Sequence, residues 1–259
     1  PTMKKTRYIA CAAMAAVLLF TAVGCQHGGE AANDPTNSVG SDGEAAGQSE
    51  YAAKAEAAYK EAVEKLVNDK VFPDGKETGF AEDNSFGTMD ENQYAIADVD
   101  GDGKDELILS YVTAPVAGES EQVYGYDEAT GALTLELSEF PEVTYYTNGI
   151  AEVAWSHNQG WAGERLWPYS LLFYNADQDA YELRYSIDAW DKTLSAQDAD
   201  GNPYPSDIDT NDDGYVVMLT EGDKTQYISA EDYETWRKDT LGDAQKIAVE
   251  YKSVTEAVK

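Results

Sequence analysis

From Gln93 onward, apolar residues recur at every second position in short runs, and this pattern constrains the fold more than any other feature of the chain. Alternation of this kind is typical of β-strands, because successive side chains of a strand point to opposite faces of the sheet. Turn pairs such as Asn148-Gly149 and Glu221-Gly222 join neighbouring runs and favour antiparallel hairpins. Strands are predicted at 94–97, 107–112, 122–126, 133–137, 143–146, 150–155, 169–174, 181–185, 215–219 and 226–228.

Helical periodicity lies on both sides of this β region. Between Tyr51 and Leu66, apolar residues recur three and four positions apart, and Ser49 is the expected N-cap. Ser229 can cap a second helix over 230–241, and the segment after Gly242 can form a strand or a further helix. The predicted fold class is α+β, mainly antiparallel β hairpins in a meander, with an N-terminal and a C-terminal helix packed on the sheet.

Two of the predicted hairpins resemble each other. YDEATGALTLELS at 126–138 and YNADQDAYELRYS at 174–186 align at a constant offset, with Tyr, Ala, Leu and Ser at matched places. A tandem repeat and two separate copies of one common hairpin would both produce this similarity. We favour two copies of a common hairpin.

The first residues have the features of a secretory signal. Basic residues precede a run from Ile9 to Val23 that has no charged residue and is too short to span a bilayer comfortably. The run ends in AVGC, which resembles the lipobox of bacterial lipoprotein signal peptides, with Ala22 where Leu is commoner. The resemblance implies that 1–24 is removed and that Cys25 becomes a lipidated N-terminus. An ordinary secretory cleavage and an uncleaved anchor are the alternatives.

Residues 25–49 are then expected to form the lipidated Cys and a flexible polar tether, because Val39 is the only large apolar residue between Gln26 and Glu50. Residues 50–259 are predicted to be a single α+β domain on the extracytoplasmic face of the cell membrane. Of the 2 cysteines, Cys11 would leave with the signal, so the mature chain would have neither a disulfide nor a thiol nucleophile. Another element must therefore stabilise the sheet outside the cell.

The charge of the chain excludes several classes of partner. The chain has 49 acidic and 18 basic residues, and its net charge is −31 at pH 7. Nucleic acids are not expected as partners, because contacts to phosphate need Lys and Arg. A polybasic membrane patch is excluded for the same reason, so the expected membrane contact is the lipid on Cys25.

The stretch DVDGDGKDE at 98–106 concentrates acidic residues on one turn, directly before the apolar run LIL. Counted from Asp98, carboxylates stand at positions 1, 3, 5 and 9, and Gly103 at position 6 permits a sharp turn. Ca²⁺ binds about six to eight oxygen ligands, and a short loop of alternating acids can surround one ion. An EF-hand is excluded, because its position 12 is Glu whereas here it is Leu109, and because the flanks are strand-like.

The stretch closely resembles the calcium-binding hairpins of FG-GAP and VCBS-type repeats, whose motif reads D-x-D/N-x-D-G-x-x-D before an apolar strand. The resemblance covers only this hairpin, and a single good copy argues against the propellers that those families form. It implies Ca²⁺ as the cofactor, with Glu in place of Asp at position 9. The implied ligands are the side chains of Asp98, Asp100, Asp102 and Glu106 and the backbone of Lys104.

A solvated acidic turn and a catalytic acid pair are the alternatives at this stretch. Paired carboxylates that cleave glycosides need separate environments that split their pKa values. Acids on one exposed turn share an environment, so the cation is favoured.

A second, less complete version of the pattern begins at Asp209. Gly214 stands at its position 6, but position 9 is Val217, which offers no side-chain oxygen. The alternatives here are a second metal ion and a plain polar turn before a strand. The residues that could hold this ion are Asp209, Asn211, Asp213 and Tyr215.

The segment WSHNQGWAGERLWPY at 155–169 is rich in tryptophan and contains the only His outside the predicted tether. Indole rings beside amide and carboxylate groups are typical of sugar-binding clefts. The alternative is that these tryptophans end strands and pack inward. The candidate ligand-binding residues are Trp155, His157, Asn158, Trp161, Glu164, Arg165 and Trp167.

The lipobox, polar tether, helix and single DGDG hairpin together resemble surface lipoproteins of Gram-positive bacteria, a resemblance that implies no activity. The expected function is a lipid-anchored, calcium-stabilised binding or structural module. A glycan- or peptide-binding lipoprotein that uses Trp155–Trp167 is the alternative. An envelope hydrolase has the least support, because the sequence has no GxSxG motif and a single His outside the tether argues against a zinc site.

Overall fold

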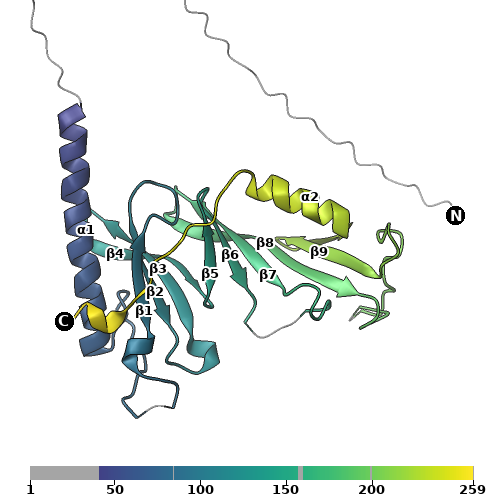
Figure 1. Cartoon of the computed structure of the whole chain (residues 1–259), viewed down its shortest axis with the longest axis horizontal. Coiled ribbons are helices and arrows are strands. Elements are labelled where there is room, and N and C mark those ends of the chain that lie inside the picture. The colour runs from purple at the N-terminus through teal and green to yellow at the C-terminus, as the bar shows by residue number, and fades with distance from the viewer. Residues whose placement is uncertain (1–40, 84, 157–159, 199, 259) are drawn as a thin grey trace, which may run out of the picture. The chain divides into compact units, whose positions relative to one another are not determined.

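The computed structural model describes residues 41–83, 85–156, 160–198 and 200–258. The predicted signal peptide, Cys25 and most of the predicted tether lie outside these residues, as do His157 and Asn158. Within them, antiparallel strands form two sheets, and a helix contacts each sheet (Figure 1). The α+β prediction is therefore confirmed.

The first sheet has the strand order β11-β1-β2-β3-β4, and the second has the order β10-β9-β8-β7-β6-β5. Both are built mainly from consecutive hairpins, as the short turn-rich links predict. In the first sheet the strands are β1 (Gln93–Ala97), β2 (Glu106–Tyr111), β3 (Ser120–Asp127), β4 (Ala132–Glu139) and β11 (Lys252–Ser253). In the second they are β5 (Val143–Tyr146), β6 (Ile150–Ala154), β7 (Tyr169–Asn175), β8 (Ala180–Asp191), β9 (Tyr215–Glu221) and β10 (Lys224–Ser229).

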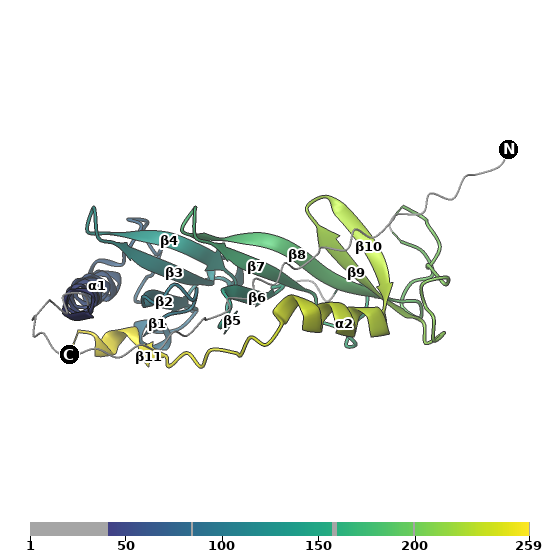
Figure 2. The same ribbon diagram turned by 90° about the horizontal axis from the view of Figure 1, so that it is seen from above.

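Helix α1 (Ser41–Asp69) covers one face of the first sheet (Figure 2). Its buried stripe, which includes Tyr59 and Val63, packs against Leu107 and Leu109 of β2, as the helical period predicts. The helix begins at Ser41, so the prediction of Ser49 as its N-cap and of a tether that reaches 49 is wrong. Ala and Glu in this stretch have high helix propensity, which favours continuation of the helix toward its N-terminus.

Helix α2 (Ala230–Leu241) lies against the second sheet and begins as predicted. The Ser229 side chain accepts a hydrogen bond from the backbone N–H of Asp232 at 3.1 Å, which satisfies one of the free donors of the first turn. Tyr233 is buried on the sheet, and its hydroxyl lies 2.8 Å from that of Tyr169. No helix among the described residues combines the length and apolar composition needed to cross a membrane.

The inner faces of the two sheets meet in a shared apolar core. Ile108 and Val123 of the first sheet belong to the same buried cluster as Ala151, Val153 and Leu172 of the second. Buried apolar contact of this kind holds sheets together when no disulfide is present.

The C-terminal segment is mostly neither the strand nor the helix that the sequence allowed. It runs beside β5, where the N–H of Ile247 donates to the carbonyl of Tyr145 at 2.9 Å, and then pairs with β1 through β11 (Figure 2). The short 3₁₀ helix η3 (Val254–Glu256) follows and packs against α1. Two further 3₁₀ turns are η1 (Met89–Glu91) and η2 (Val116–Gly118). One segment thus contacts both sheets.

The two similar hairpins, β3–β4 and β7–β8, have the same register and the same irregularity. In β3–β4, Val123 pairs with Leu137 and Tyr124 with Leu135, so Glu136 is an extra, unpaired residue. In β7–β8 the extra residue is Arg184, at the matched position of the alignment. Each is a β-bulge, which reverses the side-chain alternation of its strand. After its bulge, β8 continues to Asp191, whereas the sequence predicted that this strand ends at 185.

Candidate metal centre

The loop between β1 and β2 is folded around the carboxylate of Asp98. Oδ1 of Asp98 accepts from the N–H of Gly101 at 2.8 Å, and Oδ2 accepts from the N–H of Gly103 at 3.1 Å. Both glycines have a positive φ, 85° and 87°, a conformation that side chains disfavour. The glycines of the DGDG motif therefore let the chain turn tightly with its acidic residues close together.

Glu106 is the first residue of β2, and its side chain turns back toward the loop. Its Oε2 accepts from the N–H of Val99 at 2.9 Å, and the residue is 2% exposed. One carboxylate oxygen from each of Asp98, Asp100 and Glu106 lies within 4.8 Å of the others. Oxygens that bind one Ca²⁺ at about 2.3–2.6 Å are at most about 5 Å apart, so this group could hold a metal ion.

Asp102, the fourth predicted side-chain ligand, does not belong to this group. Its Oδ1 accepts from the N–H of Lys104 at 2.8 Å, and its Oδ2 lies 3.0 Å from Nζ of Lys104. The carboxylate is therefore bound within the loop. Roles for Asp102 and for the Lys104 backbone as ligands stay predictions.

A second group of carboxylates, which the sequence did not indicate, shares Asp100 with the first. It adds Glu136 from the bulge of β4 and Asp179 from the turn between β7 and β8, and one oxygen of each residue again lies within 4.8 Å of the others. These residues come from both sheets. The one local signal for Glu136 is a charged residue flanked by Leu135 and Leu137 within a strand, and Asp179 has the composition of an ordinary polar turn.

The second sheet fixes the acidic loop in place. The Tyr174 hydroxyl of β7 donates to Oδ1 of Asp179 at 2.7 Å and also interacts with the Asp100 carboxylate. The Tyr181 hydroxyl of β8 donates to the carbonyl of Val99 at 2.7 Å. On the other side, Tyr59 of α1 donates to the backbone of the loop. Hydrogen bonds from β7, β8 and α1 therefore hold the loop and its carboxylates in place.

Burial has the largest effect on the pKa values of Asp100, Glu106 and Glu136. The pKa of Glu106 is raised to about 9, chiefly by burial and in addition by nearby carboxylates such as Asp100, while the hydrogen bond from Val99 lowers it. The pKa of Glu136 is likewise raised to about 9, first by burial and then by the charges of Asp179 and Asp100. The pKa of Asp100 is also raised by burial. Such shifts mark carboxylates whose negative charge lacks compensation.

The loop that begins at Asp209 repeats part of this geometry. Oδ2 of Asp209 accepts from the N–H of Gly214 at 2.9 Å, as Asp98 accepts from Gly103. In this loop a basic residue from another segment forms an ion pair, because the Arg165 guanidinium lies 2.9 Å from Oδ2 of Asp213. Asn211 accepts from the N–H of Asp213, and Tyr215 begins β9. Among the described residues, this loop does not bring three acidic groups together, and an ion here stays a prediction.

In the described part of the Trp155–Trp167 segment, the tryptophan side chains make contacts to other residues of the protein. The indole of Trp161 packs edge-on against Trp190, and the Trp167 Nε1 donates to the carbonyl of Trp155 at 2.7 Å. Trp167 is 45% exposed, and Glu164 is also exposed. The Arg165 guanidinium forms its ion pair in the loop that begins at Asp209 and lies over the ring of Tyr215. Glycan or peptide binding by this segment stays a prediction.

No protein-family model, curated protein or solved structure matches this chain.

Proposed function

We propose that this protein is a lipid-anchored extracytoplasmic module whose β domain is stabilised by Ca²⁺ bound in the loop between β1 and β2. The observation that carries the proposal is the convergence of Asp98, Asp100 and Glu106, of which Asp100 and Glu106 are buried. Buried acids are costly unless a cation or hydrogen bonds compensate them. A bound divalent ion supplies that compensation.

The chemistry of the ligands favours Ca²⁺ over other divalent ions. The group contains carboxylates alone, and hard oxygen ligands suit Ca²⁺ and Mg²⁺, whereas Zn²⁺ is usually held by Cys and His. Mg²⁺ demands near-octahedral geometry and keeps several waters. A glycine-rich loop is better suited to Ca²⁺, which accepts flexible coordination.

Calcium binding is tested by isothermal titration calorimetry, in which Ca²⁺ is added to the metal-free protein. We expect Asp98→Asn to weaken binding at the loop at least tenfold, because Asn removes the charge and replaces one of the two oxygens that accept from Gly101 and Gly103. The matched control is Asp105→Asn, since Asp105 is exposed in the same loop and belongs to neither carboxylate group. Equal losses in the two variants would show that only the net charge matters, and would contradict the proposed site.

The lipid anchor rests on the AVGC sequence and the charged and apolar residues before it. We expect the full chain, expressed in a bacterium that lipidates its exported proteins, to incorporate labelled palmitate and to fractionate with the membrane. Cys25→Ser is expected to abolish both, whereas Cys11→Ser leaves them unchanged. Label that remains in Cys25→Ser would contradict the anchor without affecting the calcium site.

A further inference from the structure

We propose that Asp100, Glu136 and Asp179 bind a second divalent cation, separate from the ion in the loop, that connects the two sheets. This inference rests on the proposed calcium binding by the loop, because Asp100 belongs to both groups. The three residues come from the β1–β2 loop, from β4 and from the β7–β8 turn. An ion among them would therefore join parts of the chain that are distant in the sequence.

Glu136 gives the independent indication of a ligand. The residue is 5% exposed, and its Oε2 is buried without a hydrogen-bond partner among the described residues. Most buried polar atoms in proteins are paired, and a buried carboxylate oxygen without a donor requires an explanation. The carboxylate lies beside those of Asp100 and Asp179, a combination that is repulsive when all three are ionised and favourable with a cation among them.

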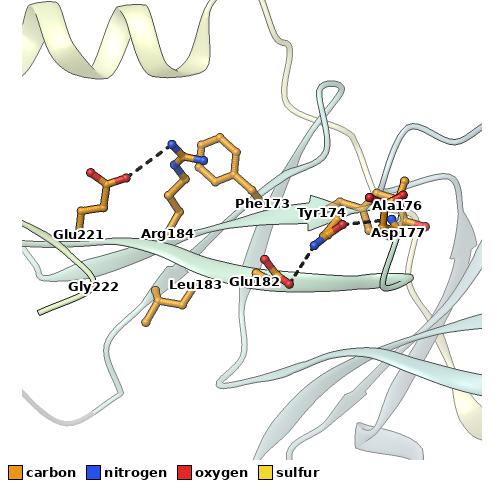
Figure 3. A pocket seen from close by; sticks show the side chains of 10 residues that line it. Phe173, Tyr174, Ala176, Asp177, Glu182, Leu183, Arg184, Glu221 and Gly222 are labelled. Atoms are coloured by element: carbon orange, nitrogen blue, oxygen red, sulfur yellow. Dashed lines mark hydrogen bonds and ion pairs between the residues drawn. The ribbon is translucent and has the colours of Figure 1, made fainter.

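The backbone by itself does not require an acid at this position. The equivalent bulge in β7–β8 carries Arg184, whose exposed side chain lies by Phe173 and forms an ion pair with Glu221 at 3.5 Å (Figure 3). The same hairpin geometry thus accepts an exposed basic residue. In β3–β4, the bulge residue is instead a buried acid that faces two others, and Gly125 leaves room for its carboxylate.

Lys104 does not neutralise this group. Lys104 affects Glu136 through its charge, but its Nζ is bound to Oδ2 of Asp102 at 3.0 Å. The Tyr174 hydroxyl between Asp100 and Asp179 has one proton to donate and cannot compensate three carboxylates. A divalent cation of the oxygen-binding class, Ca²⁺ above all, satisfies the charge and the ligand types together.

The test is the number of Ca²⁺ ions bound per chain, measured by equilibrium dialysis with metal-free protein. We expect two ions in the wild type, one in Glu136→Gln, one in Asp179→Asn and one in Asp98→Asn. The double variant Asp98→Asn/Glu136→Gln should bind none. Asp177→Asn is the matched control, because Asp177 is exposed on the same turn as Asp179 and belongs to neither group, so it should bind two.

The possible outcomes separate the two proposals. One ion in the wild type that persists in Glu136→Gln and Asp179→Asn overturns the second site and leaves the loop site intact. One ion that is lost in Glu136→Gln and in Asp98→Asn alike shows a single shared ion and also overturns it. No ion in any protein overturns both proposals.

A second test compares melting temperatures and does not depend on the number of Ca²⁺ ions counted per chain. In chelator, Glu136→Gln should melt at or above the temperature of the wild type, because Gln removes an uncompensated buried acid. In saturating Ca²⁺ the same variant should melt below the wild type, because one ion is missing. A variant that melts below the wild type by the same amount in both conditions would indicate a packing role and contradict the proposal. Asp179→Asn, at an exposed position, provides a second variant that we expect to fold like the wild type.

Discussion

Calcium at about 10 mM should raise the melting temperature of the purified protein by about 3–10 °C relative to the protein in EGTA. Extracellular calcium sites have dissociation constants of about 10⁻⁴–10⁻³ M, which gives about 1.4–2.7 kcal/mol of stabilisation for one ion at this concentration. For a domain of this size, 1 kcal/mol shifts the melting temperature by about 2–4 °C. A second ion would enlarge the shift. Differential scanning calorimetry with and without calcium measures it.

Asp100→Asn should abolish this shift, because Asp100 is shared by both carboxylate groups. Asn retains an oxygen that can accept from the N–H of Asp102, as Oδ1 of Asp100 does at 2.8 Å, so the loop can keep its conformation. A protein with a net charge of −31 is also stabilised by any divalent ion that screens its repulsion. Mg²⁺ at the same concentration and the Asp105→Asn variant control for this effect. Equal shifts with Mg²⁺, or a shift that survives in Asp100→Asn, would contradict a specific site.

The metal-free protein should become less stable as the pH rises from about 5 to about 9. Glu106 and Glu136 have pKa values raised to about 9 in the folded state from an ordinary 4.5, mainly by burial. Between these values the folded state holds protons that the unfolded state has released, so rising pH favours unfolding. Each such proton contributes a slope of up to about 1.4 kcal/mol per pH unit. The contribution of these two glutamates to the free energy of unfolding is fully present below their pKa in the unfolded state. It is lost as the pH rises through their pKa in the folded state.

Bound calcium should flatten this dependence, because the ion holds both carboxylates ionised and replaces their protons. Calcium binding at pH 7 should accordingly release protons, which calorimetry in buffers of different ionisation enthalpy detects. The double variant Glu106→Gln/Glu136→Gln should lose most of the dependence without metal. A residual decline is expected in calcium from Glu121, whose pKa burial also raises and which lies outside both groups. Identical pH profiles with and without calcium would show that neither glutamate faces the ion.

The strand pattern was predictable because it is local. Alternation and turn residues located the strands at Val143–Tyr146 and Tyr169–Asn175 to within a residue, and the Ser229 cap was visible from its neighbours. The bulges were not predictable. Alternation alone would place Leu133, Leu135 and Leu137 on one face, yet the first two pack toward α1 and Leu137 toward the other sheet. The extra residue Glu136 causes this switch, and only pairing with β3 reveals it.

The sequence by itself determined the loop group, because Asp98, Asp100 and Glu106 lie within one short turn whose glycines dictate its course. Local geometry brings these three carboxylates together, whereas Asp102 of the same turn binds Lys104 instead. The tertiary structure alone decided that Glu136 and Asp179 join Asp100, since the packing of two sheets brings them together. Contacts between residues far apart in the chain follow from how whole faces pack, and no local pattern of residue types encodes them.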